Sequence, residues 1–460
     1  MLFSSTEFIF LFLPVCLLVY FFLAKRVAYF YAKAWLLAAS LFFYAYWNPA
    51  NVWIIILSCT ANYAVGKKLL HSKNKSLLLI TIALNILVLG YYKYTDFFIA
   101  NLNLVAAQNF PLLHIILPIG ISFFTFQQVA FLVDSYQGKV PDFSFSDYCL
   151  FVTFFPQLIA GPIVHHGEMM PQFANPQSRT LTWENFTKGL FIFNMGLAKK
   201  LVIADSLSVI VVNGYQHASA LGIKEAWITS LFYSMQLYFD FSGYSDMAIG
   251  LGLLFNIHLP FNFNSPYKAI NIQDFWRRWH ITLSRFLRDY IYIPLGGSRT
   301  SETQTSRNLL LTFLIGGFWH GAGWTFIMWG ALHGIALNIH RAFSKLNIKM
   351  PNAFAILITF LFVNITWVFF RANSWDTAIH ILRAMVGLNE AQTGFTLIND
   401  YYNLPIWIAA TVLLFGKNTN EIGAAFKPTL VYGLKFVFLI LLNLLFLNSS
   451  ISQEFLYFDF

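Results

Sequence analysis

Long apolar runs separated by short polar gaps dominate this chain. They lie near residues 8–23, 34–47, 52–66, 76–92, 148–160, 186–212, 226–258, 306–319, 323–341, 352–371, 404–416 and 430–449. A helix needs about 20 mostly apolar residues to cross the hydrocarbon core of a bilayer. The pattern predicts an all-α polytopic membrane protein. No internal repeat or long charged linker divides the chain, so we expect one membrane-embedded domain over residues 1–460.

Three apolar segments are too short or too interrupted to cross a bilayer cleanly. They are residues 117–136, 154–166 and 259–279. We expect them to form re-entrant or surface helices. Non-helical backbone at membrane depth persists only where protein or a water-filled cavity satisfies its polar groups. These segments therefore indicate an internal chamber.

The composition agrees with a membrane protein, because 58% of the residues are hydrophobic and only 11% are charged. The formal net charge of +9 comes from lysines and arginines in short gaps between apolar runs, which argues against a nucleic-acid partner. Basic residues gather after the first run and after the third, at Lys25, Arg26, Lys33, Lys67, Lys68, Lys73 and Lys75. If both gaps face the cytoplasm, the N-terminus lies outside, on the periplasmic side.

Residues 268–307 carry a surplus of arginine interleaved with aromatic residues such as Trp276 and Trp279. Such a segment suits a helix at the level of the lipid headgroups, on the cytoplasmic side. Two interpretations stay open. The segment is either an interfacial anchor or an electropositive mouth, with Arg277 and Arg278, for a phosphate-bearing donor such as a coenzyme A ester.

His320 is the first candidate for chemistry. It lies in IGGFWHGAGW, residues 315–324, with Trp319 before it and Gly321 and Trp324 after it. Ionisable residues within a membrane body are costly and often mark functional sites, although a hydrogen-bonded neutral imidazole is a cheaper structural use. The flanking glycines permit either close approach of a slender acyl chain or close helix packing.

His280, in QDFWRRWHITLSRFLRDY, is the second candidate. A neutral imidazole in a dry cavity can take a proton from an attacking hydroxyl, while a second imidazole or an amide holds the oxyanion. His333 and His340 are seven residues apart on one helix face, and we interpret them as core or interface residues.

Other chemistries have little support. The sequence contains no HExxH, GxSxG, P-loop or CxxC motif. Adjacent His165 and His166 would face different ways on a helix, so we predict no metal site. The three cysteines, Cys16, Cys59 and Cys149, stand in apolar segments, and we expect buried thiols. Three acidic groups lie near or within apolar segments: Asp240, Asp246 and Asp274. They suggest a proton path, helix caps or partners for arginines, and for Asp274 a cap or an arginine partner is favoured.

Several longer motifs resemble the membrane-bound O-acyltransferases, in particular their bacterial, alginate O-acetyltransferase-like branch. The resemblance rests on MLFSSTEFIFLFLP at the start, GISFFTFQQVAFLVDSYQG at 120–138, FPQLIAGPIVHH at 155–166 and residues 238–267. It continues through DFWRRWHITLSRFLRDYIYIPLGGSR at 274–299, FWHGAGW at 318–324 and the final FLYFDF. It covers nearly the whole chain.

This resemblance implies a ring of about 11–13 transmembrane helices, with re-entrant and interfacial helices, around a central chamber. It also implies that His320 is catalytic and that His280 lines the same passage. Trp276, Arg277, Arg278, Trp279, Trp319, Gly321 and Trp324 are then candidates for contact with the donor. The implied donor is acetyl-CoA, used as a substrate with no bound cofactor.

The acceptor implied by the resemblance is an extracytoplasmic polysaccharide, alginate or similar, outside the bacterial inner membrane. It is often reached through a periplasmic partner of the serine-hydrolase-like type. Peptidoglycan and cellulose stay open as acceptors. A rival from another class is a proton-coupled transporter or channel, in which the buried histidines would relay protons.

Overall fold

The computed structural model describes residues 1–389, 397, 404–447, 455 and 456. Within these residues the chain is helical and contains no strand, which confirms the expected all-α class. The chain folds into two compact units, each assembled from separate stretches of sequence. The first comprises residues 1–194, 244–260 and 428–430, and the second comprises residues 195–243, 261–427 and 431–460. The prediction of one membrane-embedded domain stays a prediction.

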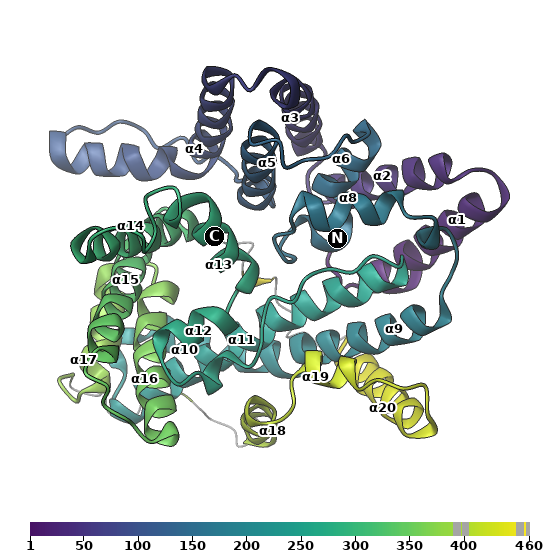
Figure 1. The fold of residues 1–460 in the computed structure, drawn as a ribbon. Coiled ribbons are helices and arrows are strands. Elements are labelled where there is room, and N and C mark those ends of the chain that lie inside the picture. The colour runs from purple at the N-terminus through teal and green to yellow at the C-terminus, as the bar shows by residue number, and fades with distance from the viewer. Residues whose placement is uncertain (390–396, 398–403, 448–454, 457–460) are drawn as a thin grey trace. The chain divides into compact units, whose positions relative to one another are not determined.

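The first unit contains α1 (Leu13–Arg26), which continues a π-helix over Phe8–Phe12, and then α2 (Tyr29–Ala45), α3 (Val52–Ser72), α4 (Lys75–Ala106), α5 (Ile121–Tyr136), α6 (Phe145–Thr153), α7 (Phe155–Leu158) and α8 (His166–Ala174). Helix α1 packs on α2, and α5 contacts both α3 and α4 (Figure 1). Helix α6 contacts α2, α3 and α8, and an ion pair of 2.8 Å between Lys33 Nζ and Asp147 Oδ1 joins α2 to α6. The short helices α5 to α8 therefore form the core of this unit.

Two long helices, α9 (Trp183–Ala198) and α11 (Ile223–Leu254), contribute residues to both units. The second unit also contains the π-helix Lys199–Ala204, α10 (Asp205–Gln216), α12 (Ile272–Arg278), α13 (Ile281–Leu287), the π-helix Arg288–Tyr292, α14 (Glu302–His320), α15 (Trp324–Ser344), α16 (Asn352–Arg371), α17 (Trp375–Met385), α18 (Leu404–Phe415), α19 (Thr419–Ala424) and most of α20 (Leu430–Leu447).

Glycines set the close packing of α14 on α15 in the second unit. A Cβ atom on Gly317 would lie 2.4 Å from the carbonyl oxygen of Phe326, and one on Gly330 would lie 2.3 Å from that of Phe313. Small residues let helix backbones approach closely where lipid supplies no hydrophobic driving force. Of the two roles left open for the glycines near His320, helix packing is the one seen at Gly317.

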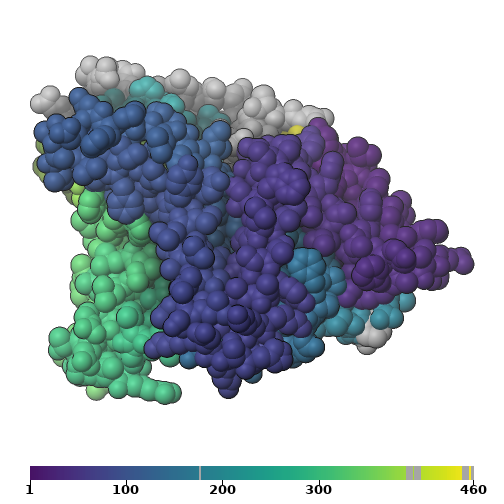
Figure 2. Space-filling model, turned by 90° about the horizontal axis from the view of Figure 1, so that it is seen from above, coloured from purple at the N-terminus to yellow at the C-terminus, as the bar shows by residue number. Residues whose placement is uncertain are grey.

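Four helices among the described residues are long and apolar enough to cross a membrane: Phe8–Arg26, Lys75–Ala106, Asn352–Arg371 and Leu430–Leu447. Only 17% of the apolar window of α4 and 6% of that of α20 are buried. Their exposed side chains are large and apolar, among them Leu84 and Leu87 on α4 and Phe438 and Leu445 on α20. Figure 2 shows the α1–α4 region, purple to blue, as one packed body within the first unit. Such apolar outer surfaces match a multi-pass membrane protein.

Most predicted runs coincide with helices, but the span expected over 148–160 is wrong. That region forms α6 and α7, of nine and four residues. A nine-residue helix is about 14 Å long, which is far short of a bilayer's hydrocarbon core of about 30 Å. All residues of both helices except Phe145 and Ser146 are buried in the first unit. The ring around a central chamber concerns both units together and stays a prediction.

Candidate active site

His320 is the last residue of α14, and the structure buries it, with 3% of its surface exposed. Three aromatic rings surround the imidazole, with centroid distances of 4.9 Å to Trp319, 5.0 Å to Trp329 and 5.2 Å to Phe370. The C-terminal end of a helix and the faces of aromatic rings both favour a positive charge. This environment is suited to an imidazole that becomes transiently protonated.

His280 joins α12 to α13 and is fully buried. Its backbone is left-handed, with φ 42° and ψ 54°, a conformation that is strained for a residue other than glycine and that gathers at functional sites. Its Nδ1 lies 3.1 Å from the side-chain oxygen of Asn262. Burial lowers the pKa of His280 to about 3, so the ring is neutral at physiological pH.

The structure brings the two predicted histidines together within the second unit. Their ring centroids lie 6.5 Å apart, with the planes inclined at 59°. Phe241 of α11 packs edge-on against His280 at 4.8 Å and also contacts Phe455, at 5.8 Å. Each imidazole packs on aromatic rings of its own, and the two rings are close enough to contact one small substrate group.

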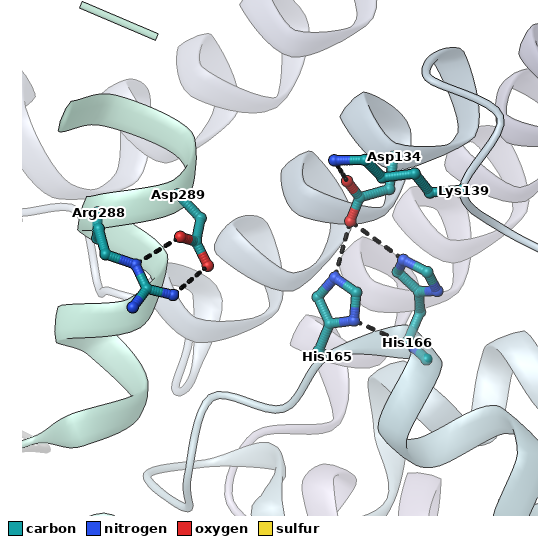
Figure 3. A network of polar contacts seen from close by, with 7 residues as sticks. Asp134, Lys139, His165, His166, Arg288 and Asp289 are labelled. Atoms are coloured by element: carbon teal, nitrogen blue, oxygen red, sulfur yellow. Dashed lines mark hydrogen bonds and ion pairs between the residues drawn. The ribbon is translucent and has the colours of Figure 1, made fainter. Parts of the chain in front are cut away.

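A cavity of about 480 Å³ opens beside α12, within the size range of small-molecule sites. Trp276, Arg277, Arg285, Arg288 and Tyr292 belong to its lining. Arg288 forms a two-pronged ion pair with Asp289, at 2.7 and 3.1 Å (Figure 3). Three guanidinium groups in one cavity make it a candidate for anions such as phosphate.

Trp276 connects this cavity to His320 through ring contacts. One part of the ring lines the cavity, and its centroid lies 5.7 Å from that of Trp329, which contacts His320. The indole Nε1 donates to Nδ1 of His333 at 3.2 Å, and Nε2 of His333 lies 3.0 Å from the hydroxyl of Thr366. His333 is fully buried with both ring nitrogens engaged, which confirms it as a core residue.

The other candidate donor contacts lie outside the cavity lining. Arg278 pairs with Asp274 at 2.9 Å and donates to the carbonyl of Asn264. Trp279 is buried against Phe275 and Trp367, whereas Trp324 starts α15 and is exposed. Trp319 packs on His320, and a Cβ on Gly321 would lie 2.1 Å from the ring of Phe326. Donor contact for these residues stays a prediction.

Of the two roles expected for Asp274, the arginine partner is confirmed. Besides the ion pair with Arg278, its Oδ2 accepts from the backbone N–H of Ile270, and Asn271 caps the same helix. Asp240 has a different partner from those expected: Nζ of Lys200 lies 2.8 Å from both Asp240 and Asp205, all three buried. Sequence reasoning missed Lys200, although a lysine within an apolar run was a usable signal.

The first unit holds a second histidine cluster, which sequence reasoning also missed. Nε2 of His165 and Nε2 of His166 lie 2.7 and 3.1 Å from Oδ2 of Asp134 (Figure 3). The argument that adjacent histidines diverge on a helix is wrong here, because His165 is the extended N-cap of α8 and only His166 is helical. Burial lowers the pKa of His166, although the bond to Asp134 raises it.

The Asp134, His165 and His166 ligand atoms lie within 4.8 Å of one another, close enough to share a metal ion. The hydrogen bonds favour another account. The backbone N–H of Gly167 donates to Nδ1 of His165 at 3.3 Å, so that nitrogen is unprotonated and the proton sits on Nε2, facing Asp134. A neutral imidazole bound to metal through Nε2 would carry its proton on Nδ1 instead.

Comparisons with known proteins place the whole chain among acyltransferases. The family model for membrane-bound O-acyltransferases matches residues 9–375. A peptidoglycan O-acetyltransferase of Helicobacter pylori is 47% identical, with 100% of this chain and 98% of that protein covered. The probable alginate O-acetylase AlgI of Pseudomonas aeruginosa is 43% identical over 85% of this chain and 76% of its own length. A teichoic acid D-alanyltransferase of Bacillus subtilis is 28% identical over 53% of this chain and 66% of its own.

Proposed function

Because the chain belongs to the membrane-bound O-acyltransferase family and is therefore an acyltransferase, we propose that it acetylates an extracytoplasmic polysaccharide from acetyl-CoA. Peptidoglycan is the first candidate acceptor, since the similarity to a peptidoglycan O-acetyltransferase extends over the whole chain. An alginate-like exopolysaccharide is the second, on the likeness to a probable alginate O-acetylase. The two acceptors present the same group, a sugar hydroxyl.

The observation that carries this proposal is the buried pair of His280 and His320, 6.5 Å apart. In the proposed step, His320 takes the proton of the attacking hydroxyl as its oxygen bonds to the thioester carbonyl carbon. The C–S bond then breaks, and the departing thiolate takes the proton back from the imidazolium. His280 assists by positioning the reacting groups. The aromatic rings and the end of α14 stabilise the transient charge on His320.

We place the donor's phosphates in the cavity beside α12, where Arg277, Arg285 and Arg288 supply the positive charge. The acyl arm would then reach His320 past Trp276 and Trp329, whose rings are in contact. Because the charged part of acetyl-CoA is cytoplasmic, this cavity would face the cytoplasm. The basic gaps after the first and third helices fit the same orientation in a bacterial inner membrane, with a periplasmic N-terminus.

A periplasmic partner of the serine-hydrolase-like type would receive the acetyl group when the sugar lies beyond the membrane surface. Alternatively, the polysaccharide itself would enter the site. Both routes consume the thioester at the same histidine pair, so consumption of the thioester is the first readout for either acceptor.

The test uses the purified full-length chain in lipid nanodiscs with acetyl-CoA and a soluble sugar acceptor, and it measures release of free thiol. In parallel, cells whose only copy is wild type or His320→Ala are assayed for polysaccharide O-acetyl groups. We expect thiol release by the wild type and no O-acetylation with His320→Ala at equal protein abundance. Retained O-acetylation in the variant would defeat the assignment of His320. A purified wild type that consumes no thioester but moves protons would support the transporter instead.

A further inference from the structure

The side chain of Asn262 makes an arrangement with His280 that bears on the proposed reaction. Asn262 lies 18 residues before His280 and is 1% exposed. Its Oδ1 is 3.1 Å from Nδ1 of His280, 3.3 Å from the backbone nitrogen of Thr282 and 3.0 Å from the Thr282 hydroxyl. The backbone adds a further tie, since the N–H of Ile281 donates to the carbonyl of Asn262 at 3.0 Å.

The contact with Thr282 decides which end of the amide faces His280. A backbone N–H can only donate, so the atom of Asn262 that faces it is the oxygen and not the NH₂ group. The same oxygen faces Nδ1 of His280. An amide oxygen can only accept, so Nδ1 carries the proton of the neutral ring. The other nitrogen, Nε2, then holds a lone pair.

We infer that Asn262 is a positioning residue, which holds His280 as the Nδ1–H tautomer so that Nε2 serves as a hydrogen-bond acceptor and not as an oxyanion donor. This inference rests on the proposed function and deepens it. It divides the work between the two histidines: Nε2 of His280 accepts a hydrogen bond from another O–H or N–H group of the acceptor and so orients it, while His320 takes the proton of the attacking hydroxyl. An oxyanion donor must then come from a group other than His280.

The backbone around His280 supports a role in orientation. The left-handed conformation of His280 begins α13 and turns the ring back toward Asn262. Strain of this kind persists where the surroundings hold it in place, and here three bonds to the Asn262 side chain and one backbone bond do so. Groups that orient an imidazole through its second nitrogen typically change activity by about 10- to 100-fold when removed.

The first experiment reads the tautomer directly and needs no activity. The full chain labelled with ¹⁵N-histidine is studied in lipid by solid-state NMR, and His280→Gln identifies the His280 signals by difference. We expect a protonated Nδ1 and an unprotonated Nε2 in the wild type, and a mixture of tautomers in Asn262→Ala. A protonated Nε2 in the wild type would overturn the inference, whatever the chain's activity proves to be.

The second experiment measures thioester turnover. Asn262→Ala should lower kcat by about 10- to 100-fold with little change in KM for acetyl-CoA. The matched control is Asn364→Ala, because Asn364 is equally buried in the same unit but bonds Ser230 and Ser234. An equal loss in both variants, or no loss in Asn262→Ala, would contradict the inference. If the wild type has no turnover, the proposed function fails while the NMR result stands.

Asn262→Asp gives a result that a purely structural role would not. An aspartate keeps an oxygen for Nδ1–H and adds a negative charge, which favours the imidazolium. The acidic limb of the kcat/KM profile should therefore move to higher pH, with activity retained above it. Among the described residues, His320 is a titratable side chain beside His280, whereas Asp240 on α11 pairs with Lys200 and Asp274 on α12 pairs with Arg278. If the pH profile of kcat/KM in Asn262→Asp is identical to that of the wild type, the hydrogen bond between residue 262 and Nδ1 of His280 does not influence the reaction, and the inference fails.

Discussion

The two histidine clusters of this chain hold the same kind of side chain in opposite ways. In the first unit, His165 and His166 both direct Nε2 at the buried carboxylate of Asp134. In the second unit, His280 bonds an amide oxygen, and His320 is packed among aromatic rings. The carboxylate of Asp134 accepts hydrogen bonds from both imidazoles and so ties α5 to the start of α8. A neutral amide instead orients a ring and leaves its basicity for chemistry.

If only the second unit carries chemistry, thioester turnover should depend on His320 and not on His165. We expect His320→Gln to lower thioester turnover by about 100- to 10,000-fold, the usual contribution of a positioned general base. His165→Gln should keep turnover within about threefold, because its contacts fix the start of α8 and not a reacting group. The measurement is thiol release at equal amounts of folded protein. Comparable losses in both variants would remove the distinction between the clusters.

The carboxylate of the first cluster should matter for stability. Asp134→Ala leaves the buried N–H of His166 and the part-buried N–H of His165 without their acceptor, which should cost about 2–4 kcal/mol of free energy of unfolding. The effect is measured as a fall in the thermal midpoint of the purified protein. Asp142→Ala is the control in the same unit, since its side chain is 90% exposed and its pairing with Lys67 should contribute little. Equal thermal midpoints for the two variants would mean that the contacts of Asp134 with His165 and His166 do not stabilise the fold.

How far the sequence alone predicts these clusters differs between them. His280 and His320 stand in recognisable motifs, and the apolar runs predicted nearly every long helix around them. The convergence of His165 and His166 depends on the extended backbone of one residue and on Asp134 of α5, 31 residues earlier. No periodicity encodes such a contact. The same holds for Asn262, whose partner is set by the left-handed turn at His280.

The helix count shows a related limit. An apolar run over 148–160 has the composition of a span, yet Phe154 leaves the helical conformation and divides it into α6 and α7. Burial within protein and burial within lipid select the same side chains, so hydrophobicity cannot separate the two. For the buried Lys200, a lysine within an apolar run was a signal, but its partners Asp205 and Asp240 were hidden, because they come from different helices.

The arginines of the cavity beside α12 test whether the second unit also binds the donor. Arg277→Gln should raise KM for acetyl-CoA by about 5- to 20-fold with little change in kcat, since one charge-assisted contact to phosphate is worth about 1–2 kcal/mol. Lys345→Gln is the control, because Lys345 is exposed and pairs with Glu302 away from the cavity lining. An unchanged KM in Arg277→Gln would move the donor's phosphates elsewhere.

The smallest expected effect is a pH dependence of stability that belongs to the first cluster. Burial lowers the pKa of His166, so the folded chain binds its proton less readily than the unfolded chain, whose histidines titrate near pH 6.5. The stability that the neutral ring contributes is complete above about pH 6.5 and is lost as the pH falls through the lowered pKa of the folded state. His166→Gln keeps an N–H donor for Asp134 but cannot titrate. The thermal midpoint of the wild type should therefore fall more than that of His166→Gln between pH 7.5 and about 5.5. Equal falls in the two proteins would show that His166 binds its proton as readily in the folded chain as in the unfolded chain.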